Sequence, residues 1–166
     1  MRRRLTWIAL LVAASACSAG GNPEPPASAR RFTEAGEDIV RDSRTGLLWT
    51  ARDAGRELEW NAAQLHCRDL ALAAGASWRL PSIEELAALY EESQRQPCGD
   101  GTCRVDAAID LTSPYQWSAS ARGESRRVYF DFRHGSELAP LLRPRLTRRA
   151  LCARADDGAA ETRPLR

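Results

Sequence analysis

Apolar side chains recur at intervals of three and four along residues 60–74, which is the spacing of an amphipathic helix with one buried face. The pattern predicts a helix that carries a cysteine among its buried side chains. The positions on the shared face are Trp60, Ala63, Cys67, Leu70, Ala71 and Ala74.

A second helix is predicted to begin after Ser82. Ser82 is a favourable N-cap, and Glu85 follows three residues later, as in a capping box. Arg79 stands shortly before this helix between two large apolar residues. We expect Arg79 to bind a carboxylate or a backbone carbonyl rather than a ligand, because such a residue is usually paired. The apolar stripe of this helix consists of Ile83, Leu86, Ala87 and Tyr90.

Alternation of apolar and polar residues predicts four stretches of β-structure. Residues 38–50 read as a hairpin around a turn at Gly46, and residues 115–121 and 127–132 read as two strands joined by a polar turn. Residues 150–154 form the last expected strand. After the leader and tether described below, about 120 residues remain for these helices and strands, which is enough for one compact domain.

The first residues of the chain read as an export signal. A basic start, a short apolar run and small residues before position 17 predict a signal peptide at residues 1–16. The small residues satisfy an ordinary signal-peptidase site, and Ala-Ser-Ala-Cys also resembles the lipobox of bacterial lipoproteins, whose cysteine is acylated. We favour acylation of Cys17, since it leaves an even number of cysteines.

Residues 17–35 then read as a lipid-anchor cysteine and a flexible tether rich in Gly, Pro, Ala and Ser. Ser18 resembles the residue that follows the cysteine in outer-membrane lipoproteins. We therefore expect a membrane attachment through an N-terminal lipid, with periplasmic or secreted locations as the alternatives. No second long apolar run follows, and residues 156–166 lack apolar periodicity, as in a disordered tail.

Four cysteines remain after Cys17, and they allow three pairings. Cys98 and Cys103 bracket a short Gly-rich loop and are natural local partners, which leaves Cys67 to pair with Cys152. A cysteine nucleophile is less favoured, because the adjacent His66 points to another side of the helix. A zinc site is also less favoured, because the cysteines do not form two close pairs and an oxidising compartment promotes disulfides.

All 24 basic residues are arginines, and the chain has a formal net charge of +2. Residues 122–154 hold nine arginines against Glu124, Asp131 and Glu137. This excess is consistent with a solvated face or with a site for sulfate, phosphate or carboxylate groups. Tyr115 or Trp117 would add a stacking surface for a sugar, although core packing is the more usual role. The predicted anionic-ligand patch consists of Arg126, Arg127, Arg133, Arg143, Arg145, Arg148 and Arg149.

Other chemistry finds little support in the residues. Asp100, Asp106 and Asp110 lack the alternating pattern of an EF-hand loop, and His134 reads as a surface residue of a turn. No Gly-rich phosphate loop or nucleic-acid motif occurs. We therefore expect no metal, no cofactor, no catalytic residue and no nucleic-acid partner.

The order of several short motifs resembles a known family. DIVRDSRTGLLW, SWRLPSIEEL, YQWSAS, RVYFDF and LCAR follow one another as in the C-terminal domain of the Legionella collagen-like adhesin (Lcl). This resemblance covers residues 36–155. It implies an α+β domain with a C-type-lectin-like fold, in which two helices pack on short antiparallel strands and a disulfide from a helix to the last strand is usual. The collagen repeat and the triplets of calcium-dependent sugar sites do not occur here.

These observations predict an exported, lipid-anchored, non-enzymatic envelope protein whose one domain serves recognition or structure. Its expected partner is an acidic polysaccharide or an envelope protein, and its oligomeric state stays open. The alternatives are an enzyme related to formylglycine-generating proteins, which share the broader fold, and a purely structural subunit of an envelope complex.

Overall fold

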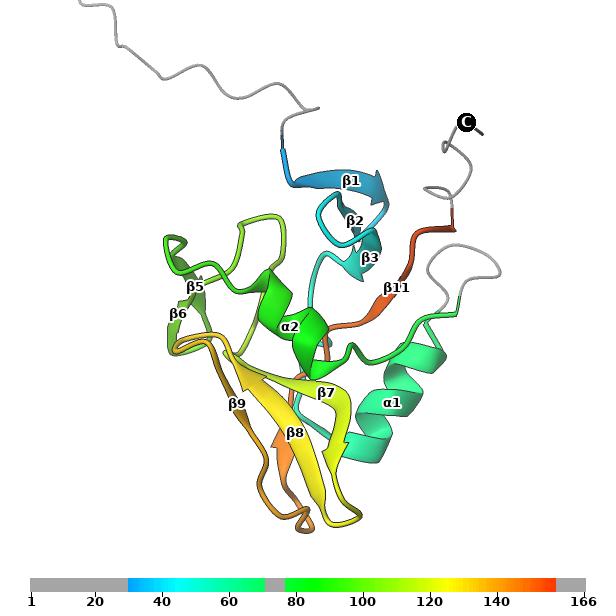
Figure 1. Cartoon of the computed structure of the whole chain (residues 1–166), viewed down its shortest axis with the longest axis vertical. Coiled ribbons are helices and arrows are strands. Elements are labelled where there is room, and N and C mark those ends of the chain that lie inside the picture. Colours follow the sequence, from blue (N-terminus) through cyan, green and yellow to red (C-terminus); the bar gives the residue numbers. More distant parts are fainter. Residues whose placement is uncertain (1–29, 71–76, 158–166) are drawn as a thin grey trace, which may run out of the picture.

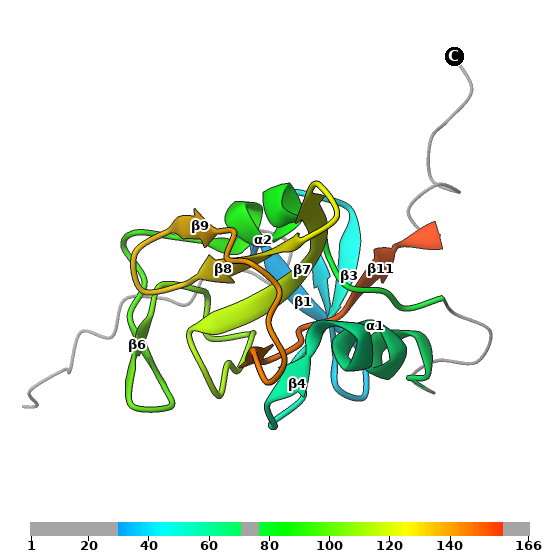
Figure 2. The ribbon, with the colours of Figure 1, turned by 90° about the horizontal axis from the view of Figure 1, so that it is seen from below.

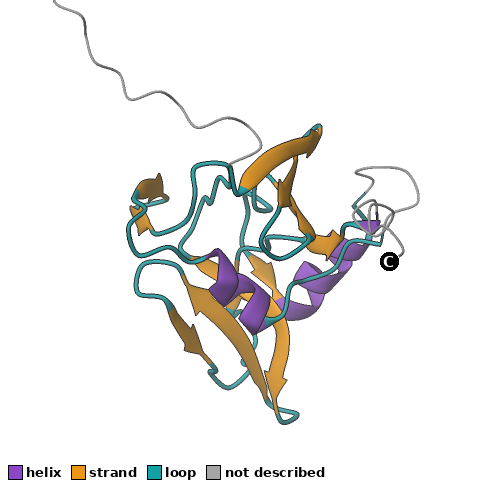
Figure 3. Ribbon diagram, turned by 45° about the horizontal axis from the view of Figure 1, so that its top comes forward, coloured by secondary structure: helices purple, strands orange, loops and turns teal. Residues whose placement is uncertain are grey.

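The computed structural model describes residues 30–70 and 77–157, and Figure 1 shows the course of this part of the chain. The helices are α1 (Trp60–Arg68) and α2 (Ile83–Leu89). The strands are β1 (Phe32–Gly36), β2 (Ile39–Asp42), β3 (Leu47–Thr50), β4 (Leu58–Glu59), β5 (Gln96–Cys98), β6 (Gly101–Cys103), β7 (Tyr115–Arg122), β8 (Arg126–Asp131), β9 (Ser136–Leu138), β10 (Thr147–Arg148) and β11 (Ala153–Ala155). The predicted α+β class is confirmed, and Figure 3 shows short strands and loops around the two helices.

Strands from both ends of the described chain share one antiparallel sheet. Its order is β1-β2-β3-β11, so the first strands pair with the last one. The predicted hairpin around Gly46 is confirmed as β2 and β3, and Gly46 has the positive φ of 69° that its turn requires. Phe32 is buried in β1, so residues 32–35, which the sequence assigned to the tether, belong to the folded domain.

The second large sheet consists of β7, β8 and β9 in that order. Figure 2 shows this sheet between α2 on one face and α1 with β4 on the other. Val128 and Phe130 pack towards α2, whereas Trp117 and Tyr129 pack with the α1 side. Because both faces of the sheet are covered, Tyr129 is buried together with Val128 and Phe130, which point to the opposite face. In a sheet with one solvated face, Tyr129 would be exposed.

The two helices follow the sequence pattern to different extents. The capping box of α2 is confirmed, because the Ser82 hydroxyl accepts from the Glu85 backbone and the Glu85 carboxylate accepts from the Ser82 backbone. Arg79 binds the same carboxylate through two hydrogen bonds of 2.7 Å, which gives it the structural role expected. Helix α1 ends at Arg68, earlier than the predicted residues 60–74, and residues 71–76 lie outside the described residues.

Both predicted disulfides are confirmed. Cys67 of α1 is bonded to Cys152 beside the last strand, across a sequence separation of 85 residues. Cys98 and Cys103 are bonded across the hairpin of β5 and β6, with a separation of 5 residues. The first bond ties α1 to the terminal sheet, and the second closes a small loop at the surface.

A buried ion pair joins the start of the domain to its first hairpin. The Asp42 carboxylate is fully buried and accepts hydrogen bonds of 2.9 and 2.7 Å from Arg31, 3.0 Å from the Arg44 backbone and 2.9 Å from Thr45. Burial alone raises the pKa of Asp42, but these hydrogen bonds and the charge of Arg31 outweigh burial and hold that pKa below its ordinary value. The ionised form of Asp42 therefore stabilises the fold.

Removal of the long-range disulfide is expected to cost more stability than removal of the local one. In the chain-entropy model, Cys67→Ala with Cys152→Ala lowers the free energy of unfolding by about 4.5 kcal/mol, and Cys98→Ala with Cys103→Ala lowers it by about 2 kcal/mol. Urea unfolding of the two double variants measures both values. A larger loss of unfolding free energy in the Cys98 and Cys103 variant would contradict the prediction that the bond between Cys67 and Cys152 stabilises the fold more.

The ion pair of Asp42 predicts a loss of stability in acid. Because its pKa is lowered by folding, its contribution is complete above the unfolded-state pKa of about 4 and disappears as the pH falls through the folded-state value. Asp42→Asn should lower the free energy of unfolding by about 3 kcal/mol at pH 7, because Arg31 loses its buried partner, and flatten the fall of that free energy in acid. Asp110→Asn is the control, since its pair with Arg52 is exposed and should contribute less than about 1 kcal/mol. Equal pH profiles for both variants would contradict the prediction.

Candidate functional site

Two arginines of the predicted patch pack against tyrosines on the α1 side of the β7–β8 sheet. The guanidinium carbon of Arg148 lies 4.3 Å from the ring centre of Tyr129 and 5.1 Å from that of Tyr115. Arg133 lies 4.7 Å from the Tyr115 ring centre and donates a hydrogen bond to its hydroxyl. Cation–π contact of this kind is attractive and fixes both partners. Arg148 and Arg133 are therefore held in place by the fold.

Trp117 and Tyr115 occupy different surroundings, although they share one face of β7. Trp117 is fully buried, packs edge to face on Tyr129 and donates its indole N–H to the Leu58 carbonyl at 2.7 Å. Core packing is thus confirmed for Trp117. Tyr115 is partly buried and contacts Arg133 and Arg148, so these arginines, rather than a sugar, cover its ring.

A polar cleft of about 450 Å³ opens beside Tyr115. The β5–β6 hairpin forms one wall, the chain before β7 forms the floor, and the residues after β8 and β10 supply two arginines. Backbone groups, hydroxyls and charged side chains dominate the lining. The lining residues are Glu57, Gly99, Asp100, Gly101, Thr112, Ser113, Pro114, Tyr115, Arg133 and Arg149.

A buried carboxylate holds the floor of this cleft. Asp53 is 5% exposed and accepts from the Thr112 backbone at 2.8 Å, the Thr112 hydroxyl at 2.6 Å and the Gly55 backbone at 2.9 Å. It also accepts from the side-chain amide of Gln116 at 2.9 Å, and that amide donates at 2.8 Å to the Ser113 carbonyl. These bonds fix residues 112–116 against the loop before β4.

Gly99 allows the hairpin wall to approach the floor. Its φ is +55°, and a Cβ at this position would lie 2.8 Å from the Thr112 carbonyl oxygen. An L side chain would therefore be strained in its backbone and would also clash with the floor. The glycine that follows Cys98 thus allows the disulfide hairpin to pack closely against residue 112 and to form a wall of the cleft.

Both arginines of the cleft lie close to a carboxylate. Arg133 lies 3.3 Å from a carboxylate oxygen of Asp131, and Arg149 lies 3.7 Å from one of Glu57. Asp131 is buried and is also 3.0 Å from the exposed ring of His134. Two guanidinium groups beside hydroxyls and backbone groups can bind a hydroxylated ligand that carries a carboxylate or sulfate.

The seven arginines of the predicted patch lie in two groups. Arg133, Arg148 and Arg149 surround Tyr115. Arg126, Arg127, Arg143 and Arg145 lie where the β7–β8 turn meets the loop after β9. In this second group, Arg127 lies 4.4 Å from the ring centre of Trp60, which lines a hollow of about 320 Å³ together with Arg143. The backbone of Arg145 donates to Glu59 at 3.3 Å, and Glu59 lines the same hollow.

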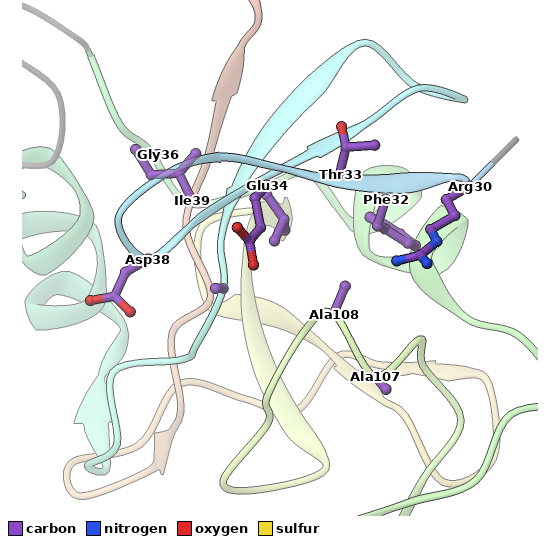
Figure 4. Close-up of a pocket in the computed structure, with 11 residues that line it drawn as sticks. Arg30, Phe32, Thr33, Glu34, Gly36, Asp38, Ile39, Ala107 and Ala108 are labelled. Carbon is purple, nitrogen blue, oxygen red and sulfur yellow. The ribbon is translucent and has the colours of Figure 1, made fainter. Parts of the chain in front are cut away.

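A larger groove of about 840 Å³ runs under β1. Figure 4 shows it between β1 and the loop of Ala107 and Ala108, with Phe32 and Ile39 among the side chains that line it. It contains no predicted site residue and few side-chain donors, so the smaller cleft beside Tyr115 is the better candidate for a polar ligand.

Metal and cysteine chemistry find no further support here. Within residues 30–70 and 77–157, no group of three or more His, Cys, Asp or Glu side chains is placed to hold a metal ion. Asp110 binds Arg52, while Asp106 accepts from the Ala108 backbone. The four cysteines of this part of the chain are all in disulfides. Burial, with a smaller effect of the Arg56 charge, lowers the pKa of His66.

Several residues that build the cleft were not predicted from the sequence. Asp53 and Glu57 come from a loop without a recognisable motif, and Thr112 and Ser113 precede a strand by a few residues. Nothing in their local sequence indicates that they meet. One part of the cleft could have been predicted: the Gly-Asp-Gly sequence between the paired cysteines is typical of a tight turn, and this turn forms one wall.

The family model of the Lcl C-terminal domain matches residues 38–143. The chain therefore belongs to the Lcl C-terminal domain family, a class of domain that suggests a bacterial envelope-related module. No curated protein and no solved structure matches the chain. Neither α1 nor α2, the helices of the described residues, could span a membrane.

Proposed function

We propose that this protein is an exported, lipid-anchored, non-enzymatic recognition module of the bacterial envelope that binds acidic glycans in the cleft beside Tyr115. The observation that carries the proposal is the meeting of Arg133 and Arg149 with the hydroxyls of Thr112 and Ser113 in one fixed cleft. Guanidinium groups suit carboxylate and sulfate, and hydroxyl and backbone groups suit the rest of a sugar.

The cleft would recognise its ligand by hydrogen bonds and charge. Tyr115 is covered by Arg133 and Arg148, so stacking on a sugar ring is not its role in this proposal. Glu57 and Asp100 also line the cleft, so its charge is balanced. Such a site suits a glycan that presents an acidic group beside hydroxyls.

The attachment to the envelope rests on the residues before the domain. The signal-like residues 1–16 and the lipobox-like sequence before Cys17 support export and acylation, and Ser18 supports an outer-membrane destination. These positions lie outside the described residues. Membrane attachment through the lipid would place the cleft among envelope polysaccharides.

We also propose that the fold is C-type-lectin-like. The disulfide from α1 to the residue before β11 supports this relation, and so does the sheet that joins β1, β2 and β3 to β11. Two helices packed on short antiparallel strands complete the similarity.

The glycan proposal predicts a specific loss of binding. The full chain with Cys17→Ser should bind a carboxylated polymer such as polygalacturonate, and heparin as a sulfated one, better than dextran, with affinity that falls as salt rises. Arg133→Gln with Arg149→Gln should lower the affinity about tenfold or more, because two charge-assisted hydrogen bonds are lost. Titration calorimetry measures the affinities.

Arg143→Gln with Arg145→Gln is the matched control, since both arginines lie outside the cleft and the same number of charges is removed. It should change the affinity less than about threefold. Equal losses in both variants would show non-specific charge attraction. Absence of binding to every polymer would refute the glycan proposal and favour a structural subunit.

Acylation is tested separately. Cells that express the full chain and receive labelled palmitate should incorporate label into the protein, and Cys17→Ala should abolish incorporation and release the protein from the membrane fraction, because Cys17 is the proposed acceptor. Cys67→Ala is the control and should keep the label. An unlabelled protein with an intact Cys17 would refute the lipid anchor.

A further inference from the structure

The end of β9 and the loop after it expose leucines in a way that the rest of the described chain does not. Within residues 30–70 and 77–157, four large hydrophobic side chains are exposed, and three of them are Leu138, Leu141 and Leu142, at 38%, 43% and 38%. The fourth, Leu65, lies on α1. Such a concentration marks an interaction surface rather than the usual scatter of single exposed residues. We call residues 138–146 the leucine loop.

The leucine loop is fastened to the sheet. The Leu142 backbone donates to the Ser125 carbonyl at 2.7 Å, and the Arg126 side chain donates to the Ala139 carbonyl at 2.8 Å. Leu141 also forms a β-bridge with Arg126. These bonds hold the loop against the β7–β8 turn, so its leucines are presented from a defined backbone.

Arginines flank the exposed leucines. Arg126 and Arg127 belong to β8, whereas Arg143 and Arg145 belong to the loop itself. The acidic side chains nearby are Glu59, Glu124 and Glu137, and Glu137 is paired at 3.0 Å with Arg122. Five arginines thus stand against three glutamates, and this end of the domain is cationic as well as apolar.

The backbone at Arg145 departs from its preferred conformation. Arg145 has a positive φ of 69°, a region in which Gly or Asn is favoured. A glycine at this position would adopt the same backbone conformation with less strain than Arg145. Strain of this kind is a reason to look for a role of the side chain outside the fold.

We propose that the leucine loop docks on the headgroup region of a bilayer that contains anionic lipids. Leucines enter the boundary of the acyl chains, and the flanking guanidinium groups bind lipid phosphates. A polysaccharide would use the arginines but not the leucines. A bilayer with anionic lipids offers both acyl chains and phosphates, and it needs no partner surface of matching shape.

This surface is distinct from the cleft beside Tyr115 and from the lipid anchor. Figure 1 shows the described chain entering at β1 at one end of the molecule and the leucine loop, after β9, at the other. Docking through the loop thus fixes how the domain is oriented on a membrane, which a lipid on a tether alone does not do.

Vesicle binding of the full chain with Cys17→Ser tests the proposal. The protein should sediment with vesicles of phosphatidylglycerol and phosphatidylcholine and much less with phosphatidylcholine alone. Leu141→Ser with Leu142→Ser, and separately Arg143→Glu with Arg145→Glu, should weaken binding about tenfold or more. Any contribution of residues 1–16 is the same in all variants, so the differences report the loop.

The matched controls are Leu65→Ser, which removes the exposed leucine of α1, and Arg56→Glu with Arg68→Glu, which reverses two exposed charges elsewhere. Both should bind within about twofold of the parent. Arg145→Gly should weaken binding without lowering the thermal midpoint, since it relieves the strained turn. Equal binding by all variants would overturn the proposal. So would leucine variants that lose self-association while they keep vesicle binding, a result that would indicate a protein contact.

Discussion

The fold depends on covering both faces of the β7–β8 sheet. Helix α2 covers one face with aliphatic side chains, while arginines complete the cover of the other, where Arg127 packs on Trp60 and Arg148 on Tyr129. The Nε atoms of both arginines are buried without a hydrogen-bond partner within the described residues. Contact with the aromatic rings offsets that loss of hydration. On this face of the sheet, the same arginines therefore carry positive charge and cover the aromatic core.

Much of this architecture follows from local sequence patterns. The capping box at Ser82 and the turn at Gly46 depend on a few adjacent residues, and both were predictable for that reason. The pairing of Cys67 with Cys152 followed from parity and from the short loop between the other two cysteines. The family resemblance agreed with these features, because it rests on the same motifs.

The arrangement of the candidate site could not be predicted in the same way. Whether an arginine faces a tyrosine or solvent depends on the register of β7, β8 and the chain after β10, which is set by long-range pairing. This register separates Arg133 and Arg149 from Arg143. The floor of the cleft likewise depends on Asp53, whose bonds reach residues about sixty positions away in the sequence.

If the domain is held through its N-terminal end, as we propose, the position of Arg31 has a mechanical consequence. Within residues 30–70 and 77–157, β1 is an edge strand that pairs with β2 alone, so a pull on the chain before it would load one ladder of hydrogen bonds. Arg31 precedes that strand and bonds Asp42 of β2, the Ala88 carbonyl of α2 and Glu91. These bonds would therefore bear part of the force before it reaches β1, and they would oppose the separation of β1 from β2.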